Sequence, residues 1–101
     1  MATPITLVSA RTAAVASGAN TTFDIEDGHA VTLVANGLAT TETITITWVL
    51  ENGATGPAAQ DTDLSTLKLT ATSWQKQIFG PARVMYDKDA TAGAASLTMY
   101  R

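Results

Sequence analysis

The chain has 101 residues, a net charge of −3 and a pI near 4.7, and this length suits one small domain. Its six lysine and arginine residues are scattered along the chain, so they form no basic cluster that would bind nucleic acid. The absence of cysteine excludes disulfides and thiolate metal sites, and we expect neither a signal peptide nor a membrane-spanning segment.

Residues 1–20 predict an extended N-terminal arm rather than part of a folded domain. The side chains are mostly small, with turn-forming residues over 17–20 and a weak strand over 5–9. A helix over 10–19 would be short and broken early, so it is not expected. We therefore place a single folded domain over 21–101 and expect the arm to be mobile until the protein assembles with a partner.

The rest of the chain consists of short runs in which apolar and polar side chains alternate, as in half-buried β-strands. The pairs Asp27-Gly28 and Asn36-Gly37 predict tight turns between such runs, and the Gly- and Pro-containing segment 52–63 predicts a loop. Short strands at this spacing predict an all-β, single-domain β-sandwich, Ig-like or jelly-roll-like, with about seven or eight antiparallel strands. The expected strands cover 22–25, 29–35, 42–51, 64–72, 73–79, 82–87 and 95–101.

The run over 42–51 has two contrasting faces. Its apolar face is expected to form the core together with residues of later strands; the predicted core residues are Ile44, Ile46, Trp48, Leu67, Leu69 and Val84. The opposite face avoids charge, either because threonine suits strands or because the face packs against a second subunit or sheet. The candidate interface residues are Thr43, Thr45, Thr47 and Val49, together with Trp74, which has polar sequence neighbours.

Groups that could carry out catalysis or bind metal are sparse. The single histidine, His29, follows a turn, where a solvated histidine is the simpler interpretation than a catalytic base. The segment Asp24–Gly28 lacks the residue order of a calcium loop. Two acidic pairs either share a cation or cap turns; they are Asp61/Asp63 and Asp87/Asp89. We expect no enzymatic activity, catalytic residue, cofactor or metal.

The second half of the chain carries a pattern known from one group of proteins. Over about 30–101 the sequence contains "LVANGLATTETITI", a Gly/Pro loop, "LSTLKLTAT" and "QIFGPARVMYDKDAT". This pattern resembles small all-β virion proteins of tailed bacteriophages, which carry a hydrophobic-x-Gly-Pro-Gly-x-Tyr/Phe-Arg type of segment. The matching residues are Ile78, Gly80, Pro81, Arg83 and Val84, with Ala82 in place of the second glycine.

The resemblance implies a non-enzymatic capsid decoration or cement protein that stabilises the capsid by binding across neighbouring major capsid subunits. Such a protein would be found in the virion, assembled in the host cytoplasm. We expect a small homo-oligomer, with a trimer as the favoured state, and neither a nucleic-acid nor a membrane partner. Two alternatives stay open: a tail, neck or fibre component of the virion, and a carbohydrate-binding β-sandwich module, which would require Trp74 to lie beside other exposed polar groups.

Overall fold

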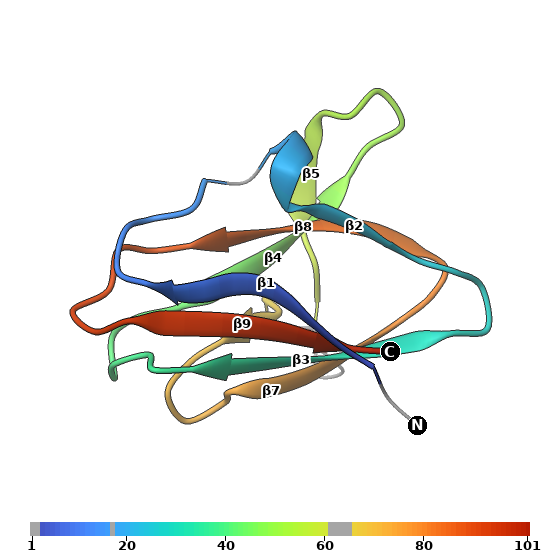
Figure 1. The fold of residues 1–101 in the computed structure, drawn as a ribbon. Helices are drawn as coiled ribbons and strands as arrows, with labels where there is room; N and C mark the ends of the chain where they lie inside the picture. Colours follow the sequence, from blue (N-terminus) through green and yellow to red (C-terminus); the bar gives the residue numbers. More distant parts are fainter. Residues whose placement is uncertain (1–2, 17, 61–65) are drawn as a thin grey trace.

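The computed structural model describes residues 3–16, 18–60 and 66–101, which form two antiparallel β-sheets packed face to face (Figure 1). One sheet has four strands in the order β1-β9-β3-β7, and the other has five, in the order β2-β8-β4-β5 with β6 also paired to β4. The predicted all-β, single-domain sandwich is confirmed. The described strands are β1 (Pro4–Arg11), β2 (Thr22–Ile25), β3 (Ala30–Asn36), β4 (Ile44–Val49), β5 (Thr55–Ala58), β6 (Lys68–Leu69), β7 (Gln75–Phe79), β8 (Ala82–Lys88) and β9 (Ala95–Tyr100), with a short 3-10 helix η1 (Ala19–Thr21) before β2.

The chain passes from one sheet to the other at most of its turns. Gly28 and Gly37 have positive φ angles of 79° and 91°, as the predicted glycine turns require. These turns do not close hairpins, however, because β2 and β4 belong to the five-stranded sheet and β3 to the four-stranded one. Apart from β4 and β5, strands that are neighbours in a sheet are not consecutive in sequence, so side chains from remote segments meet on each face.

The N-terminal segment is part of the sandwich rather than an arm outside it. Residues 4–11 form β1, one of the two edge strands of the four-stranded sheet, which pairs with β9. Val8 is buried in the core, and the backbone of Val15 forms a bridge with that of Lys88. The arm expected over 1–20 is therefore corrected for these described residues.

The alternation that would have identified β1 as a full strand is interrupted by bulges. The register with β9 shifts on both sides of Val8, and Ala10 has a left-handed φ angle of 42°. A bulge inserts a residue into one strand, so the apolar residues after it change face and the period of two is lost. Only the weak strand over 5–9 was visible in the sequence for this reason.

The core fills the space between the sheets, and its predicted members are confirmed with one exception. Five are buried: Ile44, Ile46, Leu67, Leu69 and Val84. The prediction for Trp48 is wrong, because its side chain is 37% exposed. Trp48 lies at the margin of the core beside the edge strand β7, so its indole is covered only in part.

The segment between β4 and β7 differs most from expectation. Strand β5 lies within 52–63, which the sequence predicted as a loop, and it pairs with β4 despite containing Pro57. The strand expected over 64–72 is reduced to the two residues of β6 in the described part of that range. Leu64 and the acidic pair Asp61/Asp63 lie outside the described residues.

Candidate binding surfaces

The threonine face of β4 lies on the outer surface of the five-stranded sheet, and its residues are half-buried. Thr45 pairs with Asp87 of β8 on one side and with Lys68 of β6 on the other. The Thr43 hydroxyl donates a hydrogen bond to a carboxylate oxygen of Asp89 (3.0 Å). Charged side chains therefore border a row that is itself uncharged, which weakens the inference that this face avoids charge because it is buried against a partner.

Another part of the same outer surface is covered by the chain itself. Met85 is only 2% exposed although it faces outward with Thr22 and Thr47 in the paired strands, and η1 lies against β8. Beside it, Arg83 donates two hydrogen bonds to the exposed carboxylate of Asp24 (2.6 and 3.1 Å), and this bonding lowers the pKa of Asp24. Interactions within the chain therefore cover Met85 and pair Arg83 with Asp24 on this part of the outer surface.

Trp74, the fifth candidate, lies away from the threonine face. It immediately precedes β7 in the four-stranded sheet and is 48% exposed, as expected for a contact residue. Its backbone carbonyl accepts a hydrogen bond from the Ala35 N–H of β3 (2.8 Å), which fixes the loop against the sheet. The five candidate interface residues therefore do not form one surface.

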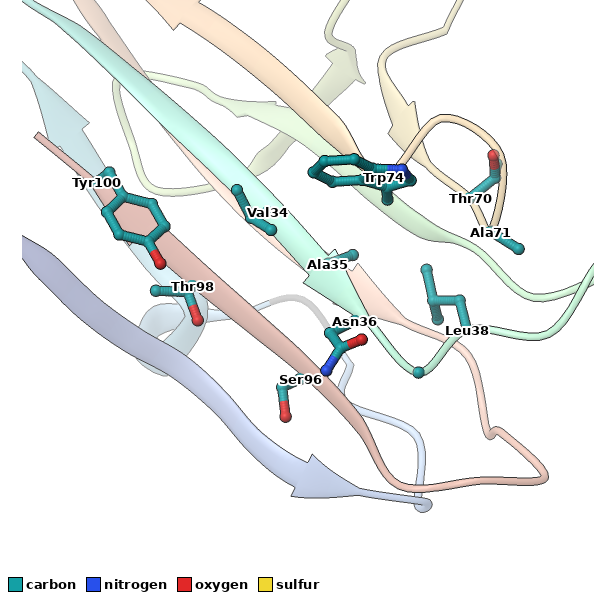
Figure 2. A pocket seen from close by; sticks show the side chains of 11 residues that line it. Val34, Ala35, Asn36, Leu38, Thr70, Ala71, Trp74, Ser96, Thr98 and Tyr100 are labelled. Atoms are coloured by element: carbon teal, nitrogen blue, oxygen red, sulfur yellow. The ribbon is translucent and has the colours of Figure 1, made fainter.

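Trp74 borders an open groove of about 660 Å³ on the outer side of the four-stranded sheet (Figure 2). The floor comes from β3 and β9, where Val34 pairs with Thr98 and Asn36 with Ser96. These two strands line the groove with the side chains of Val34, Asn36, Ser96, Thr98 and Tyr100. At the end of the groove near Trp74, the lining consists of Leu38, Thr70 and Ala71. None of the described lining residues carries a carboxylate or a basic group.

A second recess, of about 250 Å³, lies beside β7 and contains two exposed aromatic residues. Trp48 of β4 and Phe79 of β7 both line it, and Phe79 is 65% exposed. The buried residues Leu67, Ile78 and Val84 contribute to the same recess. Phe79 was not singled out by the sequence, because nothing in a short strand indicates that a large apolar residue at its end stays uncovered.

Lys88 is fully buried at one end of the sandwich and is held by hydrogen bonds. Its ammonium group donates to the carbonyl oxygens of Ala13 and Asp89 (3.0 Å each) and to the Thr91 hydroxyl (3.3 Å). Burial lowers the pKa of Lys88, an effect that the nearby Glu42 carboxylate opposes. This group joins the segment after β1 to the end of β8, which is a structural role.

Glu42 is a second buried charge near the same end. Its two carboxylate oxygens accept hydrogen bonds from the backbone N–H groups of Ala39 and Ala92 (2.6 Å each). The carboxylate therefore connects the turn before β4 to the turn before β9. Both of its oxygens have donors in the protein, so this group too has a structural function.

The described residues contain no cluster of three potential metal ligands among histidine, cysteine and the acidic residues. His29 is exposed after the turn that precedes β3. In the same part of the chain, no helix is long and apolar enough to span a membrane. Comparisons of the chain with protein-family models, with curated proteins and with solved structures gave no match.

Proposed function

We propose that this protein is a non-enzymatic structural component of a tailed-bacteriophage virion, which decorates and stabilises the capsid. The observation that carries the proposal is the recess beside β7, where Trp48 and Phe79 expose large aromatic surfaces next to buried core residues. Tryptophan and phenylalanine are enriched at protein interfaces, and a few such residues supply most of the binding free energy. The recess is thus a suitable docking site for an apolar side chain of a major capsid subunit.

The low charge of the chain supports the same proposal. Only 15% of its residues are charged, so much of its surface can be desolvated against neighbouring subunits without burying unpaired ions. A domain of this size gains stability when it binds a partner in its folded state. In a homo-oligomer, with a trimer as the favoured state, several such recesses would bind adjacent capsid subunits at the same time, which would increase the avidity. The resemblance of the "QIFGPARVMYDKDAT" segment to virion proteins of tailed bacteriophages supports a virion as the site of action.

Phe79→Ser is the sharpest test, because this side chain is mostly exposed and its loss should leave the fold intact. In capsids assembled with the variant, we expect the bound copies per particle, measured by quantitative gel analysis and electron microscopy, to fall at least about tenfold. Trp48→Ala should give the same result, with folding checked by circular dichroism. Thr45→Lys, on the opposite outer face, is the matched control and should keep full occupancy. Full occupancy with Phe79→Ser would refute docking through this recess.

A further inference from the structure

We propose that the groove between Trp74 and Tyr100 binds a neutral oligosaccharide. This inference does not rest on the capsid proposal, because the groove and the recess beside β7 share no lining residue. The groove volume of about 660 Å³ lies within the range of small-ligand sites, about 300–1,000 Å³. The shape and the chemistry of its lining together select the class of ligand.

The first requirement for a sugar site is a flat apolar surface, because one face of a pyranose ring presents C–H groups. Trp74 supplies it at one side of the groove, with 48% of its side chain exposed. Tyr100 supplies a second ring from β9, and Val34 lies between the two rings in Figure 2. Aromatic rings placed along a groove can each contact a different sugar unit, which favours an oligosaccharide over a monosaccharide.

The second requirement is a set of hydrogen-bonding groups for the sugar hydroxyls. Asn36 offers both a donor and an acceptor, and the hydroxyls of Thr98 and Tyr100 offer both as well. The Ser96 hydroxyl accepts a hydrogen bond from the Ala10 N–H (3.0 Å), which leaves its own proton to donate. These groups come from neighbouring strands of one sheet, so the backbone pairing holds them at fixed spacing.

The charge of the ligand follows from what the lining lacks. The described lining residues have no basic group to pair with a uronate, sialate or phosphate, and no carboxylate to bind an amino sugar cation. A charged ligand would lose its hydration here without gaining an ion pair. A neutral saccharide loses only hydrogen bonds that hydroxyls and amides in the groove can replace.

The test is a titration of the full chain with four neutral probes, monitored by isothermal titration calorimetry and by tryptophan fluorescence. The probes are cellohexaose, maltohexaose, laminarihexaose and N-acetylchitohexaose. We expect at least one of these probes to bind with a Kd below about 1 mM and to shift the fluorescence. Trp74→Ala should weaken binding at least about tenfold, and Asn36→Ala should weaken it less while keeping the aromatic platform. Both residues are exposed, so the variants should fold.

Trp48→Ala is the matched control, since it removes the other tryptophan and should leave the saccharide Kd unchanged. Three results would overturn the proposal: no binding of any neutral probe, binding that survives Trp74→Ala, or preferential binding of hexagalacturonate. Capsid occupancy is measured separately, so a failure of saccharide binding is distinguishable from a failure of the capsid proposal. Full capsid occupancy of Trp74→Ala together with lost saccharide binding would separate the two sites.

Discussion

Replacing Lys88 by methionine tests whether the buried ammonium group stabilises the sandwich. The two side chains have similar length, so the change removes the charge and three donated hydrogen bonds with little change in packing. The carbonyl oxygens of Ala13 and Asp89 then lose a charged donor. Because Ala13 belongs to the segment after β1, the connection of that segment to β8 is weakened as well.

The expected loss follows from the cost of unpaired acceptors. Each carbonyl oxygen left without a partner costs about 1–3 kcal/mol, and the Glu42 carboxylate loses a neighbouring positive charge. Methionine avoids the cost of desolvating an ammonium group, which offsets part of this loss. We therefore expect Lys88→Met to lower the free energy of unfolding at pH 7 by about 2–4 kcal/mol, a large share of the roughly 5–15 kcal/mol typical of a domain.

The assay is urea unfolding followed by circular dichroism between pH 7 and about 9.5. Burial lowers the pKa of Lys88 below its ordinary value of 10.5, so between these two values the unfolded chain binds more protons than the folded one. The contribution of this group to stability therefore rises with pH toward 10.5, and the methionine variant should lack that rise. Burial raises the pKa of Tyr86, which acts in the opposite direction at higher pH, and this sets the upper limit of the measurement.

Lys68→Met is the matched control, because Lys68 is exposed on β6 and its replacement should change stability little. A Lys88→Met protein that unfolds at the same urea concentration as the wild type, or at a higher one, would refute the reasoning. That outcome would mean that the cost of burying the ammonium group exceeds the value of its hydrogen bonds.

Three further predictions concern the backbone and the surface. Gly80→Ala should lower the free energy of unfolding in urea by about 1–3 kcal/mol or more, because a Cβ there would overlap the Glu26 carbonyl oxygen; wild-type stability would contradict this. Thr45→Lys should change the same quantity by less than about 0.5 kcal/mol, since charged neighbours already border this face, and a larger loss would indicate burial that we do not expect. In hydrogen exchange on the isolated protein, the amides of β1 that pair with β9 should exchange at least about tenfold more slowly than those of an unstructured peptide. Rapid exchange would contradict the pairing of β1 and would favour a mobile N-terminal arm.

The alternation of side chains was enough to predict the strands whose inward residues are regularly buried. Strands β2, β3, β8 and β9 lie within one or two residues of the expected ranges, because each places every second residue in the core. The same rule failed for β1, where bulges shift the register, and for β5, whose Gly and Pro suggested a loop. Local pattern also cannot indicate which strands pair, so neither the strand order within the two sheets nor the partial exposure of Trp48 could be predicted.

The candidate sites also combine features that the local sequence indicates with features that depend on the tertiary structure. The exposure of Trp74 was expected from its polar sequence neighbours, and the alternation within β9 places Tyr100 on the face opposite to the buried Leu97 and Met99. That the two residues border one groove depends on the pairing of β9 with β3, which the sequence does not contain. Lys88 is the opposite case, because a charged residue in an alternating strand predicts exposure, and only the tertiary structure supplies the acceptors that permit its burial.

The bulged edge strand β1 has a consequence for the behaviour of the protein at high concentration. A straight edge strand exposes a regular row of backbone groups on which a strand from another molecule can pair, which leads to aggregation. In β1 the register shifts and the left-handed Ala10 break that row. One edge of the other sheet, strand β5, is similarly irregular, because Pro57 has no N–H to donate. At these two edges, β1 and β5, a strand from another molecule therefore finds no regular row of backbone groups with which to pair.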